Sequence, residues 1–582
     1  MTLTDVLSAL FADAFGAAGL DRAFGAVKPA DRPDLAQFQC NGALAAAKAA
    51  KQNPRTIAQG VCEKLSAHDA FEGLTVAGPG FININLTDAF IAAQLEDGEG
   101  SPWAPPTLER IVLDYGGPNV AKPLHVGHLR AAIIGEALKR IFRYCGHDVV
   151  GDVHLGDWGL PMGQLIDGLK REQPELDYFN DGIAGPFPDE PPISLADLER
   201  LYPDASAACK ADEARAEAAR LATAELQAGR PGYVALWRHF IDLSRPAIER
   251  EYQDLGVTFD LWKGESDADP LIPEMAAAFK DKGLVEESDG AQIVSVARPD
   301  DAKEIPPLIL FKSDGSVLYG TTDLATIVDR VRALDPDRML YVVDQRQGLH
   351  FEQVFRASDL GGLFPEERLE HIGFGTMNGK DGKPFKTRAG GVLKLRDLID
   401  LVTEKARARI AESGLAKGYG EEEVESVARK VGVAALKFAD LSNPRTSDYV
   451  FDLDRFVAFE GKTGPYLLYA SVRVRSVLAK AADADIAPGS IQIEQDEERD
   501  LALALLAFGD ALRNTHDRRL PHILCDHAFR VAQSFASFYA ACRILDEADA
   551  TRRSSRLSLA GLAGAQLDAC LSLLGIEAPA RM

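Results

Sequence analysis

The chain has 582 residues, 46% of them hydrophobic and 26% charged, which is a globular composition and enough length for about three or four domains. Its 88 acidic and 64 basic residues leave a formal net charge of −24, which by itself opposes binding to polyanions, so RNA binding would have to be local. Seven scattered cysteines without a CxxC pair argue against a disulfide framework or a zinc knuckle, and we expect no signal peptide and no membrane helix, hence a cytoplasmic protein.

Residues 1–100 are predicted to form a small α+β domain. A leading helix is followed by an alanine-rich helix over 41–51 and by another that begins after Asn53 and Pro54. Apolar and polar residues alternate over 81–86, which indicates a strand. The stretch 96–106 is rich in glycine, proline and acidic residues, so it is predicted to be a linker.

A strand, a loop and a helix follow over residues 110–143. The run 111–113 is apolar and suits a buried parallel strand, and apolar residues recur at helical spacing from Leu129 to Ile141. The loop between them contains Lys122 and ends in the tetrapeptide His125-Val126-Gly127-His128. The two imidazoles therefore lie where the helix begins.

That position suits a phosphate. The first N–H groups of a helix have no partner within the helix and carry positive dipole, and a glycine lets a ligand approach the backbone. Lys122, His125 and His128 add side-chain donors that can stabilise charge growing on phosphorus. The alternative is that two histidines merely cap a helix, and for an isolated tetrapeptide both interpretations are open.

Residues 166–300 interrupt this α/β segment. They contain a proline-rich loop at 185–192, a charged alanine-rich helix at 211–227 and an aromatic segment from Trp237 to Trp262. Apolar strands return at 307–311 and 339–343, with a helix predicted over 322–334 between them. Two βα units on either side of a switch point predict a ligand crevice at the carboxyl ends of the strands.

A glycine-rich basic loop follows at 379–391. It carries Lys380, Lys383, Lys386 and Arg388, and such a loop suits closure over a triphosphate, although an isolated basic turn is the commoner explanation. From about residue 401 to 582 the chain is predicted to be a helical bundle. Tyr466 and Tyr469 lie three apart on one helix and Arg473 one turn later, a spacing that fits a helical core or the stacking of unpaired bases.

Together these segments resemble the class I aminoacyl-tRNA synthetases, and more closely the arginyl-tRNA synthetases of bacterial type. The run 118–130 is similar to that family's segment around its HIGH motif, and 154–159 matches the segment that follows. Residues 38–44 and 53–55 resemble the N-terminal added domain, and 460–469, 520–525 and 574–582 resemble the anticodon-binding domain. The resemblance extends over nearly the whole chain.

The resemblance implies a fold and a domain organisation. The expected fold is a Rossmann-like α/β catalytic domain over 101–400, with its insertion at about 166–300. An N-terminal α+β domain over 1–100 would contact the elbow of tRNA, and an all-α bundle over 401–582 would bind the anticodon.

The implied activity is ATP-dependent ligation of L-arginine to tRNA(Arg) by a monomer, with Mg²⁺ carried by the nucleotide and no metal bound by the protein itself. Thr387 falls where the second lysine of the KMSK motif would be, and relatives with this loss carry a lysine before HIGH, as Lys122 is here. Catalysis is assigned to Lys122, His125 and His128. The ATP-binding residues implied are Lys122, His125, Gly127, His128, Met377, Lys383, Lys386 and Arg388.

The resemblance also implies the arginine pocket and the tRNA contacts. A guanidinium is a planar, permanently charged fork of donors, so its pocket should offer carboxylates and a phenol. The arginine-binding residues implied are Asp114, Asn119, Tyr319, Asp323 and Gln347, and the tRNA-binding residues are Tyr466, Tyr469 and Arg473. Asp114 replaces a usual glutamate and Gly116-Gly117 a usual pair of serines, so a hydroxyl contact is missing or is replaced by backbone.

Two other functions remain open on sequence. One is a synthetase for another amino acid, or an adenylyltransferase with the same HxGH fold. The other is an RNA-binding protein that kept the fold and lost catalysis, which the presence of Lys122, His125 and His128 opposes. Because the family often requires bound tRNA before it activates arginine, we expect the same here.

Overall fold

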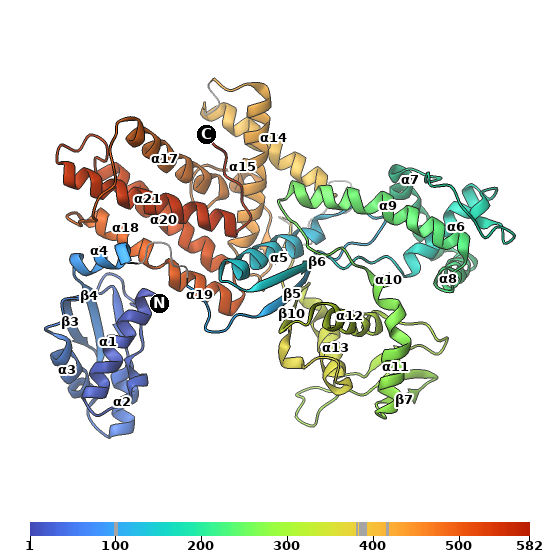
Figure 1. Cartoon of the computed structure of the whole chain (residues 1–582), viewed down its shortest axis with the longest axis horizontal. Helices are drawn as coiled ribbons and strands as arrows, with labels where there is room; N and C mark the ends of the chain where they lie inside the picture. Colours follow the sequence, from blue (N-terminus) through green and yellow to red (C-terminus); the bar gives the residue numbers. More distant parts are fainter. Residues whose placement is uncertain (98–102, 380–381, 383–392, 415–417) are drawn as a thin grey trace. The chain divides into compact units, whose positions relative to one another are not determined.

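The computed structural model describes residues 1–97, 103–379, 382, 393–414 and 418–582 (Figure 1). The chain divides into two compact units. The first comprises Met1–Pro106, Ser413–Ala434 and Ala458–Met582, and the second comprises Thr107–Glu412 and Ala435–Val457. The predicted N-terminal domain and most of the predicted C-terminal domain therefore belong to one unit. The predicted catalytic domain from Thr107 onward, with its insertion, forms the other together with 401–412 and 435–457.

The first unit joins a four-stranded antiparallel sheet to a helical bundle. The sheet has the order β1-β2-β4-β3, and Nη1 of Arg513 in the bundle lies 2.5 Å from the carboxylate of Asp5 in the leading helix. The helices predicted over 41–51 and after Asn53 and Pro54 are confirmed as α2 and α3, and the strand predicted over 81–86 is confirmed as β4. The elements are α1 (Leu3–Ala17), β1 (Val27–Pro29), β2 (Phe38–Cys40), α2 (Gly42–Ala50), α3 (Pro54–Leu65), β3 (Phe71–Ala77), β4 (Phe81–Leu86), α4 (Asp88–Asp97), α17 (Gly464–Asp483), α18 (Asp496–Leu506), α19 (Phe508–Arg518), α20 (His522–Ala541) and α21 (Ala550–Leu573), with α15 (Glu421–Leu441) shared between the units.

The centre of the second unit is a four-stranded parallel sheet in the order β11-β10-β5-β6. The predicted strand at 110–115 is confirmed as β5, whose Ile111, Val112 and Leu113 are buried between β10 and β6. Both faces of such a sheet must be covered, which is why these strands are continuously apolar. The strands are β5 (Arg110–Tyr115), β6 (Asp148–Asp152), β10 (Arg338–Val342) and β11 (Leu369–His371).

Helices surround this sheet and build the insertion. The helix predicted after the histidines is confirmed as α5 (Val126–Tyr144), and the alanine-rich helix as α8 (Glu213–Gln227). The remaining helices of this unit are α6 (Leu160–Glu172), α7 (Leu195–Ala211), α9 (Pro231–Asp254), α10 (Glu265–Ala268), α11 (Ile272–Asp281), α12 (Tyr319–Leu334), α13 (Gly348–Gly361), α14 (Leu395–Ser413) and α16 (Leu453–Phe456).

The strand predicted over 307–311 belongs to a different sheet from the one expected. The run 307–311 forms β9 (Leu308–Phe311), but β9 pairs antiparallel with β8 (Ala291–Val294), which pairs with β7 (Val285–Ser288), in a separate three-stranded sheet. The prediction that this strand returns to the parallel sheet is therefore wrong. A short apolar run shows that a strand is buried, but does not specify its partner or direction.

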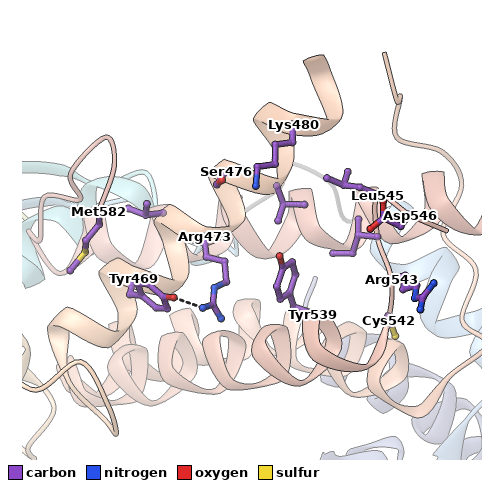
Figure 2. Close-up of a pocket in the computed structure, with 13 residues that line it drawn as sticks. Tyr469, Arg473, Ser476, Lys480, Tyr539, Cys542, Arg543, Leu545, Asp546 and Met582 are labelled. Carbon is purple, nitrogen blue, oxygen red and sulfur yellow. Dashed lines mark hydrogen bonds between the residues drawn. The ribbon is translucent and has the colours of Figure 1, made fainter. Parts of the chain in front are cut away.

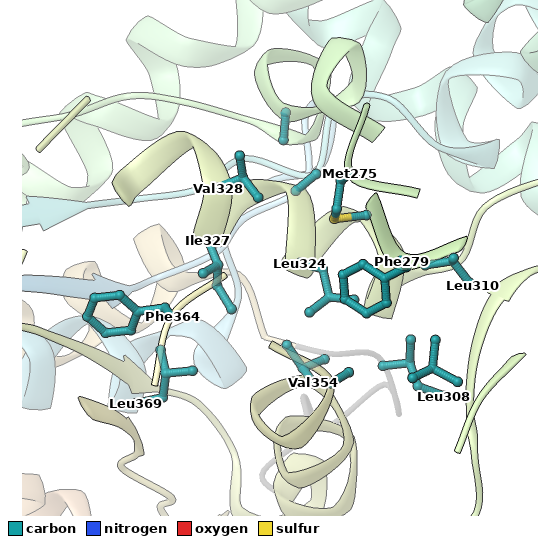
Figure 3. Packing of buried hydrophobic residues seen from close by; sticks show 14 of the residues in the cluster. Met275, Phe279, Leu308, Leu310, Leu324, Ile327, Val328, Val354, Phe364 and Leu369 are labelled. Atoms are coloured by element: carbon teal, nitrogen blue, oxygen red, sulfur yellow. The ribbon is translucent and has the colours of Figure 1, made fainter. Parts of the chain in front are cut away.

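A large apolar core joins that small sheet to the central one. It contains Phe279 of α11, Leu308 and Leu310 of β9, Leu324 of α12 and Val354 of α13, together with residues of β5, β10 and β11 (Figure 3). Burial of this core fixes α12 against the edge of the crevice. The short parallel pair β12 (Met377–Asn378) and β13 (Tyr449–Val450) completes the second unit.

Candidate active site

The two histidines cap the helix α5 reciprocally. Nδ1 of His125 accepts the N–H of Gly127 at 3.0 Å, and Nδ1 of His128 accepts the N–H of His125 at 3.1 Å. With both Nδ1 atoms used as acceptors, the proton of each neutral ring belongs on Nε2. The two histidines therefore do cap the helix, as the alternative interpretation of the sequence proposes. This arrangement leaves an Nε2–H donor on each ring.

The environment keeps both rings neutral. Burial is the main cause that lowers the pKa of His128 to about 3, and the neighbouring His125 adds to it. Burial, followed by the charge of Lys122, also lowers the pKa of His125. Two neutral imidazoles can donate hydrogen bonds to a phosphate without carrying a proton that titrates near neutral pH.

Gly127 is required by the imidazole beside it. A Cβ at this exposed position would lie 2.7 Å from Cε1 of His125, closer than real Cβ atoms approach. Any side chain here would displace the ring from its cap. The prediction that Gly127 leaves room for a ligand therefore gains a second reason.

The loop that carries Lys122 is held by the insertion. The N–H of Ala121, a residue with φ of 63°, donates to Oγ of Ser244 in α9 at 3.0 Å. The Lys122 ammonium lies 4.5 Å from the ring centre of Tyr202 in α7. The Lys122 charge contributes to lowering the pKa of both imidazoles, so Lys122 lies within electrostatic reach of the two histidines.

Tyr319 and Asp323 occupy the first two turns of α12, as their spacing predicts. Tyr319 is 67% exposed at the first position of the helix. The Asp323 carboxylate lies 2.5 Å from Nε2 of His350. Burial, then the charges of Glu265, Tyr202 and Asp323, raises the pKa of the Tyr319 phenol, so these groups share one environment.

Glu265 is a site residue that the sequence analysis missed. Burial raises the pKa of its carboxyl to about 7, with a further contribution from Asp323, while His154 opposes the shift. The N–H of Trp158 donates to Glu265 at 3.4 Å. A half-buried carboxylate beside a phenol and a second carboxylate is a place for a cation. The only signal in the sequence was an acidic residue after an aromatic segment.

Asp114 has a partner within the protein. Nη2 of Arg330 lies 2.5 Å from the Asp114 carboxylate and 2.8 Å from that of Asp152, and Arg330 is only 1% exposed. The chain thus binds its own guanidinium beside the predicted substrate pocket. Burial raises the pKa of Asp114 although the charge of Arg330 lowers it. A substrate guanidinium would meet Asp114 as part of an existing ion pair.

The other predicted contacts fall at the carboxyl ends of the strands. Asn119 follows β5 and bridges to Gly156, where a Cβ would lie 2.5 Å from Oδ1 of Asn119. Gln347 is exposed at the end of a short 3₁₀ helix after β10. Met377 is buried in β12, 7% exposed. Asn119 and Gln347 therefore both lie at the edge of the sheet where the crevice is predicted.

Lys383, Lys386 and Arg388 lie outside the described residues. The chain that follows them returns to the histidines, because the carbonyl of Leu393 accepts the N–H of Val126 at 3.1 Å. Lys394 bridges to His125 through the backbone, and its ammonium lies 2.7 Å from the carboxylate of Glu199 in α7. The segment after the basic loop is thus anchored at the start of α5.

The first unit has a cavity of about 470 Å³ beside α17 (Figure 2). Tyr469, Arg473, Tyr539, Lys480 and Met582 line it, and Arg473 donates to the Tyr469 hydroxyl while its guanidinium lies 4.5 Å from the Tyr469 ring centre. Tyr466 does not line this cavity, because its ring packs edge-on against Phe529 of α20 with centroids 5.6 Å apart. The structure brings two of the three predicted tRNA contacts together.

Two general features of the described residues bear on partners. No group of three or more histidine, cysteine, aspartate or glutamate side chains within them is arranged to hold a metal ion. Within the same residues, no helix combines the length and apolar character required to cross a membrane.

Three family models match consecutive parts of the chain. The catalytic domain of class I (R) tRNA synthetases matches residues 93–453, the arginyl-tRNA synthetase N-terminal domain matches 2–86, and the DALR anticodon-binding domain matches 467–582. The chain is also 54% identical to an arginine–tRNA ligase of Maricaulis maris and to one of Hyphomonas neptunium, with 100% of each chain covered in both comparisons.

Solved structures agree in fold. The arginyl-tRNA synthetase of Plasmodium falciparum has a TM-score of 0.81 at 23% identity, covering 100% of this chain and 99% of the other. The Thermus thermophilus enzyme has a TM-score of 0.78 at 23% identity, with 100% of both chains covered. With family models over most of its length and relatives more than half identical, the chain belongs to the arginyl-tRNA synthetase family of class I aminoacyl-tRNA synthetases.

Proposed function

We propose that the chain ligates L-arginine to tRNA(Arg) at the expense of ATP, through an arginyl-adenylate, in the cytoplasm. Family membership supports this activity. The observation that carries it is the start of α5, where two neutral imidazoles each keep an Nε2–H donor beside the helix N-terminus and the Lys122 ammonium. These are the groups that a nucleotide triphosphate requires.

In the first step a carboxylate oxygen of arginine forms a bond to the α-phosphorus of ATP, and the bond from that phosphorus to the bridging oxygen breaks. Pyrophosphate leaves with the electron pair. His125, His128 and Lys122 stabilise the charge that grows on the phosphate oxygens. Gly127 exposes the helix N-terminus, and Met377, Lys383, Lys386 and Arg388 are the further residues assigned to ATP binding.

In the second step the oxygen of a terminal tRNA hydroxyl forms a bond to the arginyl carbonyl carbon and gives up its proton to solvent. The bond from that carbon to the phosphate oxygen breaks, and AMP leaves with the electron pair. No covalent bond to the protein is required in either step. Mg²⁺ would enter bound to ATP as part of the substrate.

The arginine guanidinium would lie against Tyr319 and Asp323, with Glu265 as a further carboxylate. Asp114 would contribute charge while it remains paired with Arg330. Asn119 and Gln347 would hold the α-amino and carboxylate end of the amino acid. A pocket with more carboxylates than internal cations selects a guanidinium by charge and by its planar set of donors.

The cavity at α17 would accept an unpaired base of the tRNA. Tyr469 and Tyr539 offer ring faces, and Arg473 and Lys480 offer positive charge for the backbone phosphates. Tyr466 would support this surface from the side through Phe529.

One assay tests the proposal. Purified protein with labelled arginine, ATP and tRNA should form arginyl-tRNA. ATP–pyrophosphate exchange should depend on arginine and should fail with lysine, glutamate or cysteine. Exchange with one of those amino acids and not with arginine would contradict the pocket. We also expect exchange to require tRNA, and full exchange without tRNA would contradict that part alone.

A further inference from the structure

The insertion contributes a side chain to the catalytic crevice. Helix α7 begins at Leu195 behind a capping box formed by Ser194 and Asp197, so its first turns are firmly set. Glu199 and Tyr202 are three residues apart and therefore share one face of this helix. Glu199 contacts Lys394 and Tyr202 contacts Lys122, and both lysines lie close to the start of α5.

The first contact is between Tyr202 and Lys122. The Lys122 ammonium lies 4.5 Å from the centre of the Tyr202 ring, within the range of an attractive cation–π interaction. The second contact is the ion pair of Glu199 with Lys394, whose backbone bridges to His125. The same helix face thus reaches the chain on both sides of the histidines.

Tyr202 also acts on Tyr319, because it contributes to raising the pKa of the Tyr319 phenol, after burial and Glu265. Tyr202 is therefore in contact with the lysine assigned to the phosphates and within electrostatic reach of the phenol assigned to the guanidinium. Its ring is half-buried, so it is neither a core residue nor a free surface one.

A lysine needs such a partner here. Its four-carbon stem is flexible, and the ammonium must be in the crevice when the triphosphate arrives. A ring face attracts the ammonium without forming a strong ion pair, so the ammonium can contact the ring and the phosphate oxygens at the same time. A carboxylate in the same place would compete with the nucleotide.

We propose that Tyr202 is a positioning residue, whose ring holds the Lys122 ammonium beside the two imidazoles while charge develops on the phosphate of ATP. This inference rests on the proposed function. It adds a role for the insertion in the chemistry of adenylate formation, through a ring that the sequence places about eighty residues from Lys122.

The test is a double-mutant cycle measured by ATP–pyrophosphate exchange with arginine and tRNA present. Tyr202→Leu removes the ring and should lower kcat about 3- to 30-fold with little change in the KM for ATP. Tyr202→Phe keeps the ring and should stay within about twofold of the wild type. In a Lys122→Met background, Tyr202→Leu should have no further effect beyond about twofold, because its partner is gone.

Two control variants distinguish a loss of Lys122 positioning from a general disturbance of the packing of α7. Glu199→Gln removes the other contact of α7 and should leave the effect of Tyr202→Leu on kcat in place. Tyr144→Leu makes the same substitution at an exposed tyrosine of α5 and should leave kcat unchanged. Melting temperatures are compared throughout, and Tyr202→Gln replaces the leucine variant if that variant does not fold.

Three results would overturn the proposal: wild-type kcat in Tyr202→Leu, an equal loss for Tyr202→Phe, or a loss that persists undiminished in the Lys122→Met background. Failure of the proposed function is recognised separately, because the wild-type protein would then not form arginyl-tRNA at all.

Discussion

The backbone N–H of His125 donates to Nδ1 of His128 at 3.1 Å, and the two rings lie with their centroids 4.0 Å apart. The same bond closes the first turn of α5 and fixes which nitrogen of His128 carries the proton. Helix capping and phosphate binding are therefore two uses of one ring, and substitutions can separate them.

His128→Ala should lose both uses. We expect arginylation to fall about 100-fold or more, because a donor to the developing phosphate charge is gone, and stability to fall by about 1 kcal/mol, because the cap is gone. Glutamine can reach back to the cap N–H from this position, so His128→Gln should lose the activity but keep the stability. Kinetics and thermal unfolding measure the two effects, and tRNA binding should be unchanged in both variants. Equal destabilisation by alanine and glutamine would show that the ring does not act as a cap.

The pKa of Glu265 predicts how arginine binding depends on pH. In the free protein this pKa is about 7, raised mainly by burial, and a bound guanidinium favours the ionised form and lowers it. Below pH 7, arginine binding must therefore displace a proton from Glu265. As the pH falls below 7, the KM for arginine should increase by up to about tenfold for each pH unit, whereas above pH 7 it should not depend on pH. Steady-state kinetics from about pH 5.5 to 8.5 measure this. Glu265→Gln should weaken arginine binding and remove the slope, and a slope that survives this substitution would assign it to another group.

Asp323 and Asp114 should respond differently to loss of charge. Asp323→Asn removes a carboxylate that we assign to the substrate, so the KM for arginine should rise about 10- to 150-fold while stability changes little. Asp114→Asn leaves the buried Arg330 with Asp152 as its remaining carboxylate partner, so unfolding should become easier by about 3 kcal/mol. Chemical denaturation and arginine kinetics on both variants make the comparison. A large KM effect for Asp114→Asn without destabilisation would assign that residue to direct contact with arginine.

Substitutions of the two tyrosines of α17 should differ in their effects on tRNA binding and on stability. Tyr469→Ala removes a ring face of the cavity, so the KM for tRNA should rise about 5- to 150-fold, the usual cost of losing one stacked base. Tyr466→Ala removes a ring packed against Phe529, so stability should fall by about 2 kcal/mol while the KM for tRNA changes less. Arginylation at varied tRNA concentration, with thermal unfolding, measures both. The reverse pattern would place the base beside Tyr466.

Much of this protein follows from its sequence because the determinants are local. The capping residues of α5 lie within one turn of the bonds they make, and the apolar residues that recur from Leu129 to Ile141 are all buried in that helix. The strand β5 is recognisable by its run of three apolar residues, all buried. The same pattern predicted β9 as a strand but placed it in the wrong sheet, since an apolar run does not encode its partner.

Only the tertiary structure decided which distant groups complete the crevice. Arg330 comes to Asp114 from 216 residues along the chain, and Glu265 and Tyr202 come from the insertion. Sequence spacing specifies which residues share a face of a helix, but not which neighbour that face will meet. The neighbours of each helix are decided when the apolar core around Phe279 and Leu324 packs α11 against α12. This packing also fixes where the charged side chains carried by these helices lie.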